Sequence, residues 1–137
     1  MPFDACMRVG ELSDLATACE RVPEETVIID HAGNIVDRQG LESSAGTLRR
    51  LGSLPNVYVK VSGYPTGDIG FVTDLLDLLQ SAFPNDRLLY ASNWPVIDMY
   101  ADLDSHLSIL LDRFAGNDDF FINNARNAYH IVERKKP

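Results

Sequence analysis

The sequence of 137 residues predicts an α/β protein built from parallel β/α units. Three observations lead to this fold class. Short β-rich runs alternate with longer helical runs, four times in succession. The second β-rich run is continuously apolar, as expected for a strand that is covered on both faces. Polar residues stand at the ends of the runs, where parallel α/β folds carry their sites.

The first two units are predicted over the N-terminal part of the chain. Residues 3–8 form a short strand, and a helix near residues 11–21 follows, because its apolar side chains recur at helical spacing. Residues 27–31 form the second strand, which the turn-forming residues 32–34 end. A helix near residues 41–51 completes the second unit.

The third strand, residues 57–62, ends at Gly63, and a helix near residues 69–83 stops before Pro84. The fourth strand, residues 88–93, is closed by Trp94 and a proline. A complete barrel of such units has eight strands and about 250 residues. Four units therefore amount to half of one.

Two more helices are predicted after the fourth strand, over residues 103–114 and 121–132. Residues 117–119 (Asn-Asp-Asp) are expected to supply the N-cap of the second. His106 and His130 lie on these helices, away from the strand ends, so both are expected to be surface residues.

The composition excludes several classes of function. The formal net charge of −8 argues against nucleic acid and membrane partners, because an acidic surface repels phosphates and anionic lipid. No apolar run approaches the roughly 18 residues of a membrane span, and the N-terminus does not have the pattern of a secretory signal. Cys6 and Cys19 form no zinc motif and fit a reducing compartment. We expect one cytoplasmic domain over residues 1–137.

The candidate site consists of polar residues at or next to the predicted strand ends: His31, Lys60, Ser62 and Asn93. Lys60 interrupts an apolar strand, which favours a pocket cation for a carboxylate substrate over a surface lysine. His31 is expected on the strand face of Val27 and Ile29. Asp30 is equally suited to orient a neighbouring group and to cap the following turn.

Five stretches form a pattern in order and spacing: residues 3–8, 27–33 (VIIDHAG), 56–63 (NVYVKVSG), 87–96 (RLLYASNWPV) and 123–129 (NNARNAY). Together they resemble strands five to eight and the last helix of the amidohydrolase-related family, which includes the fuconolactone and pyrone-dicarboxylate lactonases. The resemblance covers nearly the whole chain. It implies the C-terminal half of a (β/α)8 TIM barrel with an extra C-terminal helix.

The resemblance also implies roles for the site residues. His31 corresponds to a histidine that reaches a metal or the substrate, and Lys60 and Ser62 correspond to residues that line the pocket. The family's eighth strand carries a Ser-Asp-Trp-Pro motif whose aspartate is the general base, whereas this chain has Asn93 there. A neutral amide cannot accept a proton from water, and losing a positioned base costs on the order of 10²- to 10⁴-fold in rate. Trp94 is a candidate substrate contact, although a role in packing is the favoured alternative.

The family's first strand carries a His-x-His metal pair, which this chain lacks. We therefore expect no cofactor in this chain, although the resemblance implies a divalent metal, zinc, in full-length members. The implied reaction is hydrolysis of lactone- or amide-type C–O or C–N bonds. In it, water attacks a carbonyl of a small-molecule carbonyl or carboxylate substrate that His31 and Lys60 bind or polarise. We expect the chain to be incomplete and weakly active or inactive alone. The alternative is a non-catalytic, self-associating half-barrel module.

The predicted half-barrel has two unpaired strand edges, at residues 3–8 and 88–93. Its inner face is expected to be apolar and uncovered, since the strands are rich in Val, Ile, Leu and Tyr. Both features favour association, either as a homodimer or with a missing N-terminal half.

Overall fold

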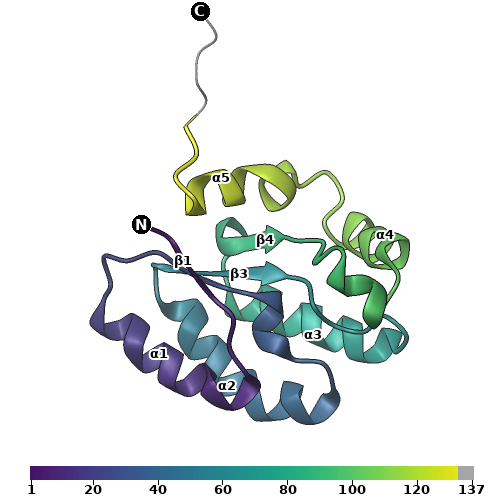
Figure 1. Cartoon of the computed structure of the whole chain (residues 1–137), viewed down its shortest axis with the longest axis horizontal. Coiled ribbons are helices and arrows are strands. Elements are labelled where there is room, and N and C mark those ends of the chain that lie inside the picture. The colour runs from purple at the N-terminus through teal and green to yellow at the C-terminus, as the bar shows by residue number, and fades with distance from the viewer. Residues whose placement is uncertain (133–137) are drawn as a thin grey trace, which may run out of the picture.

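The computed structural model describes residues 1–132 and contains a four-stranded parallel sheet in sequence order (Figure 1). The strands are β1 (Phe3–Ala5), β2 (Val27–Ile29), β3 (Val57–Val61) and β4 (Leu88–Tyr90). Each neighbouring pair is parallel, as the β/α alternation predicts. The sheet and its helices confirm the predicted α/β half-barrel.

Three helices, α1 (Leu12–Arg21), α2 (Arg38–Ser53) and α3 (Ile69–Ala82), lie together on one side of the sheet in Figure 1. A fourth, α4 (Leu103–Arg113), lies beside α3, and its Arg113 donates a hydrogen bond to Gln80. Aspartates begin three of these helices, because each side chain accepts a hydrogen bond from a backbone N–H of the first turn. These N-caps are Asp37 for α2, Asp68 for α3 and Asp102 for α4.

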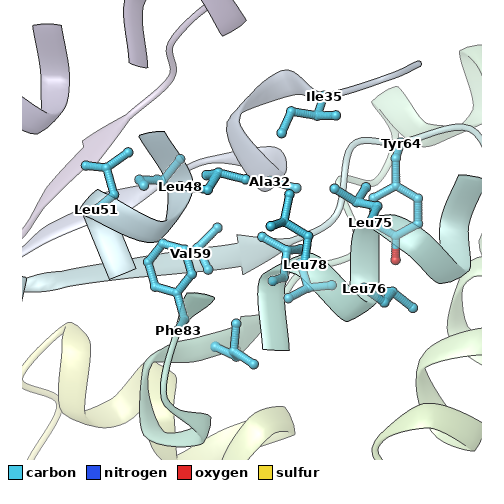
Figure 2. Close-up of a cluster of buried hydrophobic side chains, with 14 of the residues drawn as sticks. Ala32, Ile35, Leu48, Leu51, Val59, Tyr64, Leu75, Leu76, Leu78 and Phe83 are labelled. Atoms are coloured by element: carbon cyan, nitrogen blue, oxygen red, sulfur yellow. The ribbon is translucent and has the colours of Figure 1, made fainter. Parts of the chain in front are cut away.

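The main core lies between the sheet and these helices. Alternation along β3 directs Val57, Val59 and Val61 into it, and all three are fully buried. Figure 2 shows Val59 among leucines of α2 and α3, with Phe83 beside it.

The last helix covers the opposite face of the sheet. A π-helical turn, η5 (Asp119–Asn123), leads into α5 (Asn124–Ala128), which lies across the sheet from α1, α2 and α3 (Figure 1). Ile28, Leu89 and Ala128 are buried together, with Tyr58 and Tyr129 packed around them. The expectation of an uncovered apolar inner face is therefore wrong in this region, because α5 covers it.

The observed strands end before the predicted ones. The chain turns into the left-handed region just after each of three strands, at His31 (φ 53°), Gly63 (φ 81°) and Asn93 (φ 55°). That conformation cannot continue a strand. The candidate site residues therefore stand in the turns that follow the strands.

The C-terminal helix is also shorter than predicted, since α5 ends at Ala128. Asn117 accepts a hydrogen bond from the backbone N–H of Phe120 in η5, the turn that leads into the last helix. The prediction that residues 117–119 supply the N-cap of the last helix itself is wrong, because the N-cap of α5 is Asn123. No helix within residues 1–132 is long and apolar enough to cross a membrane.

Candidate functional site

A hollow of about 660 Å³ opens beyond the carboxyl ends of the strands. Its lining combines small, apolar and uncharged polar side chains: Cys6, His31, Asn34, Val36, Gly63, Pro65, Asn93, Val96 and Tyr100. Two residues predicted from the sequence, His31 and Asn93, are thus brought together. The position agrees with the rule that parallel α/β folds place their sites at this edge.

His31 begins a short turn, η2 (His31–Asn34), in which all four residues have positive φ. For residues other than glycine this conformation costs roughly 1–2 kcal/mol each. Two hydrogen bonds hold the turn: Asn34 Nδ2 donates to the Met7 carbonyl at 2.6 Å, and Gly33 N–H donates to the Asp30 carbonyl at 3.0 Å. The prediction that His31 shares the strand face of Val27 and Ile29 is wrong, because β2 ends before this turn.

The ring of His31 is held by Ser62 and Gly63. His31 Nδ1 lies 3.0 Å from Ser62 Oγ, and the Ser62 side chain is fully buried. A methyl group at Gly63 would lie 2.3 Å from His31 Cβ, so only glycine fits there. Burial lowers the pKa of His31, and the nearby Lys60 ammonium adds to this, while Asp30 and Asp4 act in the opposite direction. The neutral imidazole is therefore favoured.

Asn93 forms the other side of the hollow. Its Nδ2 donates a hydrogen bond to the Tyr100 hydroxyl at 2.7 Å. Ser92 Oγ accepts a hydrogen bond from the backbone N–H of Trp94, which shapes the turn after β4. The Trp94 side chain is 65% exposed and does not line the hollow. This exposure argues against the favoured expectation that Trp94 is a packing residue.

Lys60 lies on the inner face of the sheet and does not line the hollow. Its Nζ is 2.7 Å from Asp30 Oδ1 and 3.2 Å from Asp4 Oδ1, and it lies 5.6 Å from the centre of the Tyr129 ring. Burial alone would lower the pKa of Lys60, but the hydrogen-bonded Asp30 and Tyr129 outweigh burial and raise it. The sequence predicts that Asp30 either orients a neighbouring group or caps the following turn. In the structure the Asp30 carboxylate orients Lys60, and its side chain does not cap the turn.

The prediction that His106 is a surface residue is wrong. Its side chain is 1% exposed, and its Nε2 lies 2.9 Å from the carbonyl oxygen of Ala91, just after β4. Burial lowers the pKa of His106. The sequence contained a signal for this, since His106 lies four residues before the buried Leu110 and shares its helix face. His130 is exposed, as predicted.

Among the residues that line the hollow, sequence reasoning missed Cys6, Asn34 and Tyr100, whose side chains carry a thiol, an amide and a hydroxyl group. Cys6 directly follows β1 and Asn34 ends the turn after β2, so both have the strand-end placement that selected His31. Tyr100 comes seven residues after Asn93, and no strand-end rule points to it.

These residues do not fit a divalent metal. Within residues 1–132 no group of three His, Cys, Asp or Glu side chains could hold an ion. His31 is the one imidazole of the hollow, and Asn93 supplies a neutral amide where a carboxylate would be needed.

Comparison with known proteins places this geometry in a family. A family model described as amidohydrolase (Amidohydro_2) matches residues 1–131. The L-fucono-1,5-lactonase of Burkholderia multivorans is 30% identical over 129 residues, which cover 82% of this chain and 43% of that protein.

Among solved structures, amidohydrolase 2 from Bifidobacterium longum subsp. infantis superposes with a TM-score of 0.85 at 42% identity, over 96% of this chain and 51% of its own. A zinc-bound amidohydrolase from Burkholderia multivorans superposes with a TM-score of 0.84 at 24% identity. The superposition covers 96% of this chain and 53% of that protein, and it supports the fold. The chain spans about half the length of the relatives it matches. From the family match and the lactonase relative together, the chain belongs to the amidohydrolase family.

Proposed function

We propose that this chain is the carbonyl-binding C-terminal half of a hydrolase that opens lactone- or amide-type C–O or C–N bonds. The observation that carries the proposal is His31, held by Ser62 at the edge of a hollow beyond the carboxyl ends of the strands. An imidazole fixed in this way can bind or polarise a carbonyl oxygen. The similarity to a lactonase supports the same reaction class.

The charges favour a neutral substrate over a carboxylate. No Asp, Glu, Lys or Arg side chain lines the hollow. Lys60, the cation predicted to bind a carboxylate, is paired with Asp4 and Asp30 instead. A neutral lactone, with one carbonyl and several hydroxyl groups, matches the amides of Asn34 and Asn93 and the hydroxyl of Tyr100.

The reaction also requires a group that accepts a proton. When water attacks the carbonyl carbon, the C–O bond to the leaving oxygen breaks, and a water proton must reach that oxygen. Asn93 can orient water through its amide, but it cannot accept the proton. We therefore propose that this chain binds and orients the substrate and is weakly active or inactive alone.

The amide at Asn93 and the poor fit to a metal favour a second candidate, a non-catalytic half-barrel that binds a ligand and associates with itself. Both candidates use the same hollow. They differ in whether any turnover depends on His31.

Titration with δ-valerolactam, a stable six-membered cyclic amide, tests the shared step by two-dimensional NMR. We expect shifts at Gly63 and Asn93 and none at Gly46, on the outer side of α2, and His31→Ala should abolish them. Absence of shifts at the hollow would contradict the proposal. Hydrolysis of L-fucono-1,5-lactone, with zinc measured by elemental analysis, separates the candidates: turnover that His31→Ala removes indicates the hydrolase and rules out the non-catalytic module.

A further inference from the structure

The hydrogen bond between His31 and Ser62 determines what His31 presents to the hollow. A neutral imidazole carries one proton, on Nδ1 or on Nε2, and the partner of one nitrogen fixes the state of the other. Nδ1 lies 3.0 Å from Ser62 Oγ, while Nε2 has no partner among residues 1–132. The direction of this single hydrogen bond therefore decides whether Nε2 is a donor or an acceptor.

The surroundings of Ser62 settle the direction. Its side chain is fully buried, and His31 is the partner of its hydroxyl within the described part of the chain. If Nδ1 carried the proton and donated to Oγ, the hydroxyl hydrogen of Ser62 would be buried without an acceptor, which native structures avoid. If Ser62 donates to the Nδ1 lone pair, both groups are satisfied.

We propose that Ser62 is a positioning residue that fixes His31 as the Nε2–H tautomer, so that His31 presents an N–H donor to the hollow. A donor at this place complements the carbonyl oxygen of a substrate and offers no lone pair to a metal ion. This use of the donor rests on the proposed function, whereas the tautomer does not.

Two further features of the site agree with this assignment. The lowered pKa of His31 keeps the ring neutral, which is the only state in which Nδ1 can accept a hydrogen bond. The backbone of Gly63 lies against His31 Cβ and encloses the side chain on that side.

The other histidines provide references within the same molecule. His106 Nε2 lies 2.9 Å from the carbonyl oxygen of Ala91, and a carbonyl can only accept, so His106 must carry its proton on Nε2. His130 is exposed and should show the averaged tautomers of a free imidazole.

Long-range ¹H–¹⁵N correlation of ¹⁵N-histidine-labelled protein tests the proposal at a pH where the rings are neutral, with His31→Gln identifying the His31 signals. We expect His31 to match His106, with an unprotonated Nδ1 and a protonated Nε2. Ser62→Ala should move His31 toward the averaged pattern of His130, and Ser62→Thr, which keeps the hydroxyl, should restore the wild-type pattern.

A protonated Nδ1 or an averaged signal for His31 in the wild-type protein would overturn the proposal, even if Ser62→Ala did not fold. An unchanged His31 pattern in folded Ser62→Ala would overturn it too. A confirmed Nε2–H tautomer in a protein that binds no lactam would refute the proposed function and leave the tautomer assignment standing.

Discussion

The hydroxyl of Tyr129 donates a hydrogen bond to Asp4 Oδ1 at 2.6 Å and so joins the C-terminal end of α5 to β1, 125 residues away in the chain. The same carboxylate oxygen lies 3.2 Å from Lys60 Nζ, which also contacts Asp30. Burial and the Asp4 carboxylate raise the pKa of Tyr129, so its hydroxyl remains a donor at neutral pH. This cluster fixes α5 over the inner face of the sheet.

Tyr129→Phe removes this hydrogen bond and keeps the ring. We expect the free energy of unfolding to fall by about 1 kcal/mol, less than is usual for a bond to a charged group, because Asp4 is partly exposed. Tyr58→Phe is the matched control, since Tyr58 packs on the same face and its hydroxyl forms no hydrogen bond within residues 1–132. Urea denaturation of the two variants checks this. Equal stabilities would show that the link to Asp4 contributes nothing.

The sheet could be predicted because its signals are local. Alternation from Val57 to Val61 and the apolar β2 segment identify strands without knowledge of their neighbours. The partners of Lys60 could not be predicted, because Asp4, Asp30 and Tyr129 come from three elements far apart in sequence. Local patterns also missed the left-handed turns at His31 and Asn93, since both residue types tolerate strand and turn conformations.

Gly63→Ala should disturb the site and the fold together. The added methyl group would lie 2.3 Å from His31 Cβ, and the φ of 81° is unfavourable for alanine. We expect a loss of about 1–3 kcal/mol in the free energy of unfolding, with shifted His31 resonances. Gly67→Ala is the control, because a methyl group added there would have no neighbour within 4 Å and the effect should stay within about 0.5 kcal/mol. Similar losses in both variants would contradict the close packing at Gly63.

The buried His106 predicts a loss of stability in mild acid. Burial lowers its pKa in the folded protein, so the unfolded chain binds the proton more readily. His106 therefore contributes stability at pH values above its ordinary pKa of 6.5. This stability is lost as the pH falls from 6.5 through the pKa of His106 in the folded protein. His106→Gln keeps an N–H donor for Ala91 and does not titrate, so the drop in urea midpoint between about pH 7.5 and about pH 5.5 should shrink. A drop in His106→Gln as large as that in the wild-type protein would refute the prediction.

Asn93→Asp restores the carboxylate of the family motif at the edge of the hollow. The Tyr100 hydroxyl, 2.7 Å from Asn93 Nδ2, can then donate to the new carboxylate. We still expect no rise in hydrolysis of L-fucono-1,5-lactone above the level of Asn93→Ala. The reason is that His31 does not complete a metal site with other His, Cys, Asp or Glu side chains of residues 1–132. Turnover in Asn93→Asp that His31→Ala abolishes would show that the hollow holds a complete catalytic site.

The free edges of the sheet bear on association. Within residues 1–132, β1 and β4 each pair with one strand only. Beside β1 lies an apolar hollow of about 470 Å³ between the strand and α1, lined mainly by Met1, Phe3, Leu15, Ala18, Cys19, Val22 and Val27. Between successive units of this chain, neighbouring helices pack against each other, α2 against α1 and α3 against α2.

We expect the isolated chain to form a homodimer at micromolar concentration, because a two-fold axis can place β4 of each copy beside β1 of the other and close eight strands. Since α5 covers part of the inner face, the strand edges and the apolar hollow beside β1 must supply most of the contact.

Phe3→Lys puts a charge on the β1 edge, which blocks edge pairing, and should shift sedimentation toward the monomer. Ile69→Lys is the matched control: Ile69 is also 61% exposed but begins α3, away from both edges, and its variant should remain dimeric. A wild-type chain that sediments as a cooperatively unfolding monomer at every concentration would rule out the homodimer, and equal dissociation of the two variants would place the interface elsewhere.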